Sequence, residues 1–556
     1  MQVAEIIVKI LEKEGITDAF GIPGAGINAV YKHLGQTKAI SHYIVRHEEA
    51  AVHSADAYFR ASGRMAMAIC TSGPGATNFV TGLYTANIDS IPLLAITGQA
   101  VRSQLGKDAF QCVDIAEITK TITKMSVCVT DPESIPKVFA EAFRTAREGK
   151  PGPVLIDLPL DVQMADIDYD PANYEPLPIP VVKPCPDKVK AAAELLLSAK
   201  APVIIMGGGV ILSRAEKELI EFAEYLQIPV ITTYMAKGGI PVDHPLNAGH
   251  AGIQVGQPIG NKILSGSDVV LGVGCRFTDR HTGDIKSYSE GRRFIHIDIE
   301  PTQIGKIVKA EIGIVSDAKL AIEALFNEVK AITPARKPIE RVKALPALRA
   351  ELKRKTDYNT DPIKPQRVYE EMNRAFDDET LFTTGCGLNQ IWSGQLQDIN
   401  KPRRYLPSGG AGTLGFDIPA AIGAMVACPG HKAVAVMGDF GFTFMPEEIA
   451  VAATYKLPLV VVIVNNAYLS LIRQNQKYAY QYEYEVHVKE DHVLFDYIKL
   501  AEGLGGAGER VFKTEDIAAA FERAKASDKP YIVDIIVEED TDCSMGGSIT
   551  GVREFV

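Results

Sequence analysis

The sequence lacks several features that would place it in a specialised class of protein. It has no run of about 18 uninterrupted apolar residues, so we expect no membrane span. Its 8 cysteines are scattered without a C-x-x-C pair, which in a chain of 556 residues indicates reduced core thiols and argues against a disulfide framework or a zinc site. The first residues, MQVAEIIVKILEKEGI, have the pattern of an amphipathic helix and are unlike a signal peptide, so we expect a cytoplasmic protein.

An excess of positive charge is also missing. The formal net charge is −11, which argues against non-specific binding to nucleic acid or to an anionic membrane. Hydrophobic residues make up 46% of the chain and charged residues 23%, as in ordinary globular enzymes. Because the chain is too long for one hydrophobic core and shows no repeat with a period of about 20 to 50 residues, we expect three or four domains.

Proline-rich and charged stretches divide the chain into three units. In each unit, short apolar runs alternate with glycine turns and helical patterns, which predicts an α/β fold of three doubly wound parallel-sheet domains. The expected domains are 1–163, 187–330 and 366–540, followed by a glycine-rich tail at 541–556. The expected linkers are a proline-rich one at 164–186 and a basic one at 332–365, whose helical middle we expect to be a solvated charged face.

The most informative stretch covers residues 434–476. An apolar run ends in Gly438-Asp439, a helical pattern follows, and the β-branched run LPLVVVIV ends in Asn465-Asn466. Such runs predict neighbouring buried strands of a parallel sheet, and ligands bind at the carboxyl ends of these strands. Oxygen atoms of Asp439 and Asn466 can therefore converge on a cation such as Mg²⁺ that is shared with a diphosphate. The glycines would admit the phosphates, and a helix expected after Asn466 would offer its amino end.

These residue types alone leave a second interpretation open. In an ordinary βαβ unit, an Asp and an Asn at these places simply cap helices. Two other glycine turns are weaker signals, and the first is more typical of a structural turn. TSGPGATN fits a phosphate loop or a structural turn, while Gly207–Gly209 resembles a dinucleotide pocket but lacks the G-x-G-x-x-G spacing.

A series of motifs resembles one enzyme family almost from end to end. GIPGAGIN, TSGPGATN, ITGQA, KPGPVLIDLP, RFTDRHTG, HIDIEPTQIG, KPQRVYEEMN, GGAGTLG and VNNAYL follow the order of the thiamine-diphosphate-dependent acetohydroxyacid synthase and glyoxylate carboligase family. Pieces such as RHTGDIKSYSEGR, NNAYLSLIRQNQ and the carboxyl-terminal SMGG are most similar to its glyoxylate carboligase branch. The resemblance implies a pyrimidine-binding domain, a central domain holding FAD and a diphosphate-binding domain. It also implies active sites formed between two chains, and hence at least a homodimer, with a homotetramer expected.

The resemblance assigns the metal and the thiamine diphosphate site. The Mg²⁺ ligands would be the side chains of Asp439 and Asn466 and the carbonyl of Tyr468. Leu414 matches the bulky residue that holds the cofactor bent, and Glu48 matches the carboxylate that protonates its pyrimidine ring. The residue types alone would favour a core leucine and a solvated helix glutamate. The other residues expected at this cofactor are Gly24, Ala25, Asn78, Leu388, Asn389, Gln390, Gly412, Gly438, Phe440, Gly441 and Leu469.

Two further sets of residues follow from the same resemblance. Phe110 and Gln111, on the DAFQ loop, match residues that face the substrate from the neighbouring chain. FAD, which does no redox work in these carboligases, would lie along Gly207, Gly208, Gly209, Arg276, Asp279, Arg280, Asp298 and Asp317. Lys150 stands where the family commonly has an arginine before Pro-Gly-Pro.

Three positions bear on the substrate. Phe440 replaces the second glycine of the usual Gly-Asp-Gly motif, as glyoxylate carboligases tend to do. Asn475 stands where acetohydroxyacid synthases carry a Trp that helps to select 2-ketobutyrate, which argues against the branched-chain biosynthetic role. Glu48, by contrast, stands where glyoxylate carboligase characteristically has valine, and Glu49 is the fallback acid.

We therefore expect a carboligase that depends on thiamine diphosphate and Mg²⁺ and acts on small 2-oxo acids. The leading interpretation is the joining of two glyoxylate molecules into tartronate semialdehyde and CO₂. An acetolactate synthase acting on two pyruvate molecules is the alternative that Glu48 favours. A simple decarboxylase, an aldehyde ligase, and a non-catalytic flavin- or nucleotide-binding protein with the same fold are the remaining interpretations.

Overall fold

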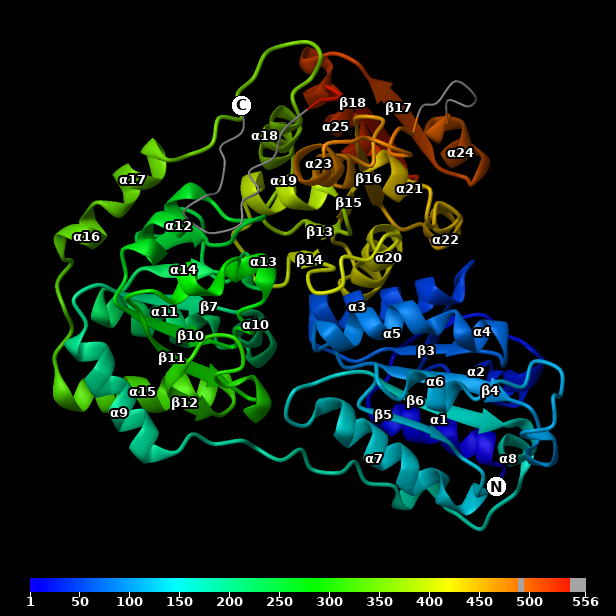
Figure 1. Cartoon of the computed structure of the whole chain (residues 1–556). Helices are drawn as coiled ribbons and strands as arrows, with labels where there is room; N and C mark the ends of the chain where they lie inside the picture. Colours follow the sequence, from blue (N-terminus) through cyan, green and yellow to red (C-terminus); the bar gives the residue numbers. More distant parts are fainter. Residues whose placement is uncertain (489–494, 541–556) are drawn as a thin grey trace.

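The chain folds into three α/β domains, as a computed structural model covering residues 1–488 and 495–540 shows. Each domain is built on a parallel sheet of six strands with helices around it, which confirms the predicted fold class. The first domain lies at the lower right of Figure 1, the second at the left and the third at the upper right. No helix within the described ranges has both the length and the apolar character needed to cross a membrane.

The first sheet has the strand order β2-β1-β3-β4-β6-β5. Its strands are β1 (Asp18–Gly21), β2 (Ser41–Ile44), β3 (Met67–Cys70), β4 (Leu94–Gln99), β5 (Met125–Cys128) and β6 (Val154–Pro159). Its helices are α1 (Val3–Lys13), α2 (Asn28–Leu34), α3 (Glu48–Ser62), α4 (Pro74–Thr77), α5 (Phe79–Ile88), α6 (Ile115–Thr119), α7 (Ile135–Arg147) and α8 (Leu160–Met164). Side chains along β3 alternate between two cores, because Ala68 packs in one and Met67 and Ile69 in the other.

The second sheet has the order β12-β11-β10-β7-β8-β9. Its strands are β7 (Pro202–Met206), β8 (Val230–Thr232), β9 (Asn247–His250), β10 (Val269–Val273), β11 (Arg293–Asp298) and β12 (Ala310–Val315). The helices of this domain are α9 (Pro186–Ser198), α10 (Gly208–Ser213), α11 (Glu216–Leu226), α12 (Pro258–Ser265), α13 (Asp279–Thr282), α14 (Ile285–Ser289) and α15 (Ala318–Ile332).

The third sheet has the order β14-β13-β15-β16-β18-β17. Its strands are β13 (Leu381–Thr384), β14 (Tyr405–Pro407), β15 (Ala433–Gly438), β16 (Leu459–Asn465), β17 (Ala507–Val511) and β18 (Tyr531–Ile536). Its helices are α18 (Pro365–Ala375), α19 (Leu388–Leu396), α20 (Asp417–Ala427), α21 (Asp439–Phe442), α22 (Glu448–Thr454), α23 (Ser470–Asn475), α24 (Tyr497–Gly503) and α25 (Ile517–Ala526). All seven residues of β16 are buried, as its unbroken apolar run predicts.

The two stretches expected as linkers differ from each other. Residues 165–185 contain no strand or α-helix longer than a single turn and run from the first domain to the second along the lower edge of Figure 1. The stretch 332–365 instead carries α16 (Glu340–Lys343) and α17 (Leu345–Glu351). Because Val342 and Leu345 are buried in cores of the second domain, the expectation of a wholly solvated charged face is wrong.

Helix α3 of the first domain packs along α20 of the third, and the two lie at the centre of the boundary in Figure 1. The Ser54 hydroxyl donates to the Pro419 carbonyl at 2.9 Å. Gly423 is required at the contact, because a Cβ built there would lie 2.0 Å from the Ser54 carbonyl oxygen. The core formed by this contact also contains Ala435 and Met437 of β15, so the first domain helps to hold the strand that leads to Asp439.

A buried acid at the start of α20 gives a testable pH dependence. Burial raises the pKa of Asp417 to about 7, even though its carboxylate accepts from the Gly385 N–H. When the pKa of an acid is higher in the folded than in the unfolded chain, the acid contributes to the stability of the folded protein. This contribution is complete at a pH below the unfolded pKa and is lost as the pH rises to the folded pKa. We expect the thermal unfolding midpoint of the cofactor-free protein to fall as the pH rises from about 4 to about 7. Asp417→Asn should make the unfolding midpoint depend less on pH, and the difference should correspond to at most about 3–4 kcal/mol in unfolding free energy. The same pH dependence in wild type and variant would contradict this.

Candidate active site

The carboxyl ends of β15 and β16 meet at one edge of the third sheet. The two strands are hydrogen-bonded neighbours, with Gly438 opposite Val464. Asp439 follows β15 directly and Asn466 follows β16 directly, so both lie at this edge as the sequence predicts. The helix expected after Asn466 begins at Ser470 and has six residues.

A cavity of about 150 Å³ opens at this edge. Nine of the residues expected at the thiamine diphosphate site line it: Leu388, Asn389, Leu414, Gly438, Asp439, Phe440, Gly441, Asn466 and Leu469, together with Tyr468. Two other residues of the third domain that were expected at this site do not line the cavity. Gln390 turns towards the second domain, where its Oε1 accepts from Arg280 Nη2 at 2.9 Å. Gly412 lies near Cys386, because a Cβ built there would lie 3.8 Å from Cys386 Sγ.

The carboxylate of Asp439 lacks a partner in the interior. The residue is 2% exposed, and its Oδ2 makes no hydrogen bond within the described chain. Burial raises its pKa to about 7, since a charged carboxylate is poorly solvated there. A buried carboxylate oxygen without a donor is costly unless a cation or a ligand neutralises it. This oxygen fits a metal-binding position.

The other two predicted metal ligands already converge on one atom. The Ser470 hydroxyl lies 2.7 Å from Asn466 Oδ1 and 3.1 Å from the Tyr468 carbonyl oxygen. An amide oxygen, a backbone carbonyl and a carboxylate form the oxygen-rich set that Mg²⁺ prefers. The residues present therefore fit a hard divalent cation.

The two neighbouring asparagines have different tasks. Asn465 is tied into the sheet, because its Nδ2 donates to Asp534 at 2.9 Å and its Oδ1 accepts from the Ala467 N–H. Asn466 lines the cavity instead. Between Asn466 and Tyr468, Ala467 adopts a left-handed conformation with φ +64°, which costs about 1–2 kcal/mol for a residue other than glycine. Strain of this kind is concentrated at functional sites.

Leu414 faces the cavity and is only half-buried, so it does not serve as a core residue. Its side chain reaches the turn after β15, where a Cβ at Gly441 would lie 3.8 Å from Leu414 Cδ2. Trp392, the one tryptophan of the chain, also lines the cavity and is 1% exposed. Its indole Nε1 has no hydrogen-bond partner within the described chain.

Glu48 lies at a second edge, formed by the carboxyl ends of strands in the first sheet. It is the first residue of α3, and its Oε2 accepts from Asn78 Nδ2 at 2.8 Å. Asn78 belongs to the TSGPGATN turn, in which Gly75 leaves room for Glu48 because a Cβ there would lie 3.2 Å from Glu48 Oε1. Glu49 instead pairs with His53 at 3.2 Å. The 150 Å³ cavity of the third domain is not lined by Glu48.

The other first-domain residues expected at the site share this edge. Gly24 and Ala25 follow β1, and a Cβ at Gly24 would strike the Thr71 side chain at 2.5 Å. The DAFQ loop packs on the same turn, because a Cβ at Gly73 would lie 2.7 Å from Gln111 Cβ. Phe110 beside it is 87% exposed in the single chain. The edge thus brings together Gly24, Ala25, Glu48, Asn78 and Gln111, with Phe110 pointing outward.

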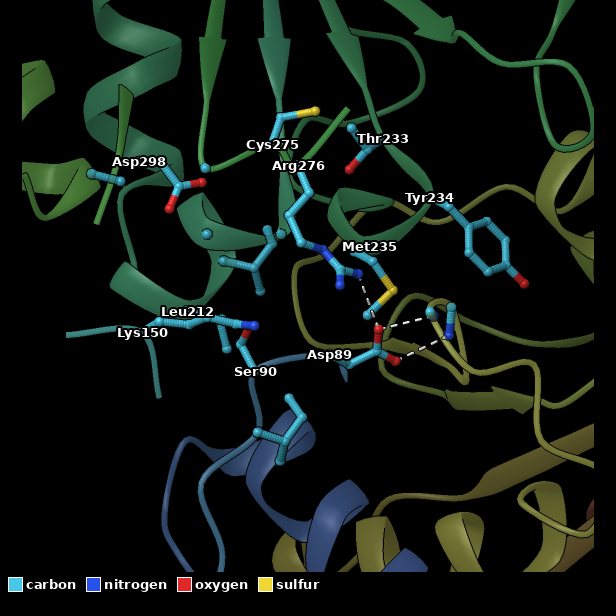
Figure 2. A pocket seen from close by; sticks show the side chains of 18 of the residues that line it. Asp89, Ser90, Lys150, Leu212, Thr233, Tyr234, Met235, Cys275, Arg276 and Asp298 are labelled. Atoms are coloured by element: carbon cyan, nitrogen blue, oxygen red, sulfur yellow. Dashed lines mark hydrogen bonds and ion pairs between the residues drawn. The ribbon is translucent and has the colours of Figure 1, made fainter. Parts of the chain in front are cut away.

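A larger cleft of about 520 Å³ lies among the three domains. Seven of the eight residues expected along FAD line it: Gly208, Gly209, Arg276, Asp279, Arg280, Asp298 and Asp317. Gly207 does not, because it packs against β10, and a Cβ there would lie 2.1 Å from the Gly274 carbonyl oxygen. Figure 2 shows Lys150 and Ser90 of the first domain on one side of this cleft, opposite Arg276 and Asp298 of the second.

A buried ionic network joins the domains at the bottom of this cleft. Asp89 accepts from the N–H groups of Gly409 and Gly410 at 3.1 and 2.9 Å, and it pairs with Arg276 at 3.5 Å, as the dashed lines of Figure 2 show. Its other ion-pair partner is the buried Arg60, at 3.1 Å. The network fixes one face of the cleft from all three domains.

Comparison with known proteins follows the same three-part division. Models of the thiamine pyrophosphate (thiamine diphosphate) enzyme N-terminal, central and C-terminal domains match residues 1–118, 189–325 and 385–535. The chain belongs to the thiamine pyrophosphate enzyme family. Within this family it is 46% identical to the glyoxylate carboligase of Escherichia coli O157:H7, over 100% of this chain and 96% of that protein.

Acetolactate synthases are further members of the family similar to this chain. The probable acetolactate synthase large subunit of Methanocaldococcus jannaschii is 40% identical over 99% of this chain and 95% of its own length. The acetolactate synthase large subunit of Corynebacterium glutamicum is 39% identical over 97% and 87%. Family membership and the set of relatives thus establish a thiamine-pyrophosphate-dependent carboligase family without fixing the substrate.

Proposed function

We propose that the protein joins two glyoxylate molecules into tartronate semialdehyde with release of CO₂, using thiamine diphosphate and Mg²⁺. The observation that carries the proposal is the meeting of Asp439, Asn466, Tyr468 and Leu414 around one cavity at the tips of β15 and β16. The Escherichia coli relative named glyoxylate carboligase supports the choice of glyoxylate. The choice of glyoxylate is also supported by Asn475, an exposed residue of α23. A tryptophan at this position would favour 2-ketobutyrate as a substrate.

Each residue of the site would have a separate role in binding the cofactor or transferring a proton. Asp439 Oδ2, Asn466 Oδ1 and the Tyr468 carbonyl would hold Mg²⁺, and the glycines beside Asp439 would admit the phosphates. Leu414 would press against the cofactor and keep it bent. Bound thiamine diphosphate supplies the carbon centre that accepts electrons when CO₂ leaves. Glu48 would hold and return a proton at the pyrimidine ring, with Asn78 keeping its carboxylate in place.

Two chains would complete each site. The 150 Å³ cavity is smaller than the pockets of about 300–1,000 Å³ that take a whole small-molecule ligand. Glu48 and the exposed Phe110 lie on the first domain, away from the cavity of their own chain. A partner chain that brings its first-domain edge to this cavity would supply the acid and cover the phenyl ring, which argues for a homodimer within a homotetramer.

The larger cleft is proposed to hold FAD without a redox role. Its volume of about 520 Å³ lies in the range of cofactor pockets, and Arg276 and Lys150 are cations among the residues that line it. Burial raises the pKa of Asp298 at the end of β11, which fits a carboxyl that meets a ligand hydroxyl.

Acetolactate synthesis from pyruvate is the second candidate. It is favoured by Glu48, an acid at the position where glyoxylate carboligase has valine, and by the relatives named acetolactate synthase. Both candidates use the same metal site and the same cleft, so they differ only in the two substrates.

A substrate comparison tests the proposal. Purified protein with thiamine diphosphate, Mg²⁺ and FAD is given glyoxylate, pyruvate or both, and CO₂ and the products are measured. We expect at least about 10-fold higher kcat/KM with glyoxylate than with pyruvate, equivalent to 1.4 kcal/mol of discrimination, and a three-carbon product. A preference for pyruvate with formation of acetolactate would replace the proposal by its alternative, and free aldehyde would indicate a simple decarboxylase.

A further inference from the structure

A carboxylate of the third domain reaches across to the segment that leads into Glu48. Glu448, the first residue of α22, accepts from the Arg46 N–H at 2.7 Å and from the His47 N–H at 3.1 Å, both with Oε1. These two residues directly precede Glu48, and the His47 ring caps α3 by accepting from the Glu49 N–H at 3.2 Å. The backbone that presents Glu48 is thus held by a side chain from another domain.

The far end of α22 holds the same segment. The Tyr455 hydroxyl, one residue beyond the helix, accepts from the Ile44 N–H at 2.8 Å, and its ring lies 4.9 Å from that of Tyr43. Helix α22 and the residue after it therefore accept three N–H groups from residues 44–47, which comprise the last residue of β2 and the turn before α3. These donors would otherwise lack partners from secondary structure.

The environment of the Glu448 carboxylate is energetically unfavourable. Glu448 is 0% exposed, and its Oε2 has no hydrogen-bond partner within the described chain. A buried charged or acidic group without an ion partner destabilises the protein unless its hydrogen bonds compensate. Within the residues that the structure describes, its hydrogen bonds come from two N–H groups of one loop.

We infer that Glu448 is a positioning residue for catalysis, which fixes the residue 44–47 segment and thereby aims the Glu48 carboxylate. The inference rests on the proposed function, because it concerns the acid of that site. Asp439 begins α21, nine residues before Glu448, so one short stretch carries both a metal ligand and the anchor of the acid. A displacement of about 1 Å at a catalytic group can cost about 10²-fold in rate.

Three variants of Glu448 and one variant of the neighbouring Glu447 test the inference. Glu448→Ala removes both acceptors, and Glu448→Asp retracts the carboxylate by one methylene. Glu448→Gln keeps an oxygen that can accept both N–H groups. Glu447→Ala, which removes the adjacent half-buried carboxylate, is the matched control.

The first readout needs no catalysis. Hydrogen–deuterium exchange of a peptide covering residues 44–48 in cofactor-free protein should be about 10-fold faster in the Ala and Asp variants than in wild type, since two buried hydrogen bonds are lost. The Gln variant and the Glu447 control should exchange at the wild-type rate. Equal exchange in all proteins would overturn the inference.

The second readout separates positioning from a general structural role. With the 2-oxo acid that the wild-type protein turns over, kcat of the Ala and Asp variants should fall about 10²-fold, with less than about 3-fold change in KM and in thiamine diphosphate affinity. The Gln variant should keep kcat within a few-fold. If kcat of the Gln variant falls as far as that of the Ala variant, or if the loss follows cofactor affinity, the positioning role is refuted. If the wild-type protein turns over neither glyoxylate nor pyruvate, the proposed function is refuted instead. The hydrogen–deuterium exchange measurement would then still show whether Glu448 fixes residues 44–47.

Discussion

Glu48→Gln is expected to lower kcat by about 10²–10⁴-fold, the usual contribution of a positioned proton donor or acceptor. The amide oxygen can still accept the bond from Asn78 Nδ2, so the helix start and the cofactor affinity should be unchanged. What is lost is the ability to exchange a proton with the pyrimidine ring. The measurement is steady-state turnover of glyoxylate and pyruvate, combined with the rate at which bound thiamine diphosphate exchanges its C2 proton.

Glu49→Gln is the matched control for this prediction. Glu49 lies in the same first turn of α3, but its carboxylate pairs with the buried His53. We expect turnover within a few-fold of wild type. A large loss in Glu49→Gln together with an active Glu48→Gln would show that the acid is assigned to the wrong residue. A Glu48→Val variant with unchanged turnover of glyoxylate would show that the protein needs no acid here.

Asp439→Ala is expected to weaken Mg²⁺-dependent cofactor binding by at least about 100-fold, more than the 10–100-fold that changes outside the ligand shell cost. The same change should leave the cofactor-free protein as stable as wild type or more stable, because it removes a buried carboxylate oxygen that has no partner in the described chain. Most destabilising substitutions in a protein core lower both the ligand affinity and the stability of the ligand-free protein. Opposite effects on binding and stability are the signature of a ligand-binding group.

Thermal unfolding with and without ligands measures both effects for Asp439→Ala. Saturating cofactor at 100 times its dissociation constant should stabilise wild type by about 2.7 kcal/mol and the variant by almost nothing. Ser54→Ala is the control: the Ser54 hydroxyl is bonded to the Pro419 carbonyl in the buried contact between α3 and α20 and takes no part in the metal site, so its loss should lower the unfolding midpoint and leave the ligand-induced increase intact. An unchanged ligand effect in Asp439→Ala would exclude this residue from the metal site.

The sequence was sufficient to predict that β15 and β16 are buried parallel strands of one sheet. Its apolar runs are long enough to be buried on both faces, and the carboxyl ends of such strands have to meet at one edge, as Asp439 and Asn466 do. The roles of Leu414 and Glu48 could not be derived in this way. A leucine after a glycine turn and a glutamate at a helix start are common, and only the resemblance singled them out.

Other features required three-dimensional contacts between distant residues. Glu448 lies in PEEIAVA, an ordinary helix start, and its partners Arg46 and His47 are about 400 positions away. Trp392 and Ser470 were not among the residues expected at the site, although both line the cavity. The charge of the second linker gave no sign that Val342 and Leu345 are buried. The glycine-rich tail at 541–556, including SMGG, lies outside the described residues.

The central claim, that the tips of β15 and β16 form a Mg²⁺-dependent thiamine diphosphate site, can be tested with the fluorescence of Trp392. This one tryptophan lines the cavity, so its emission reports on occupancy without an added probe. Titration with thiamine diphosphate in the presence of Mg²⁺ should change the emission saturably. The change should be absent with a chelator, with Asp439→Ala, or with thiamine, which lacks the diphosphate. Saturable binding of thiamine diphosphate that is unaffected by the chelator and by Asp439→Ala would contradict the account.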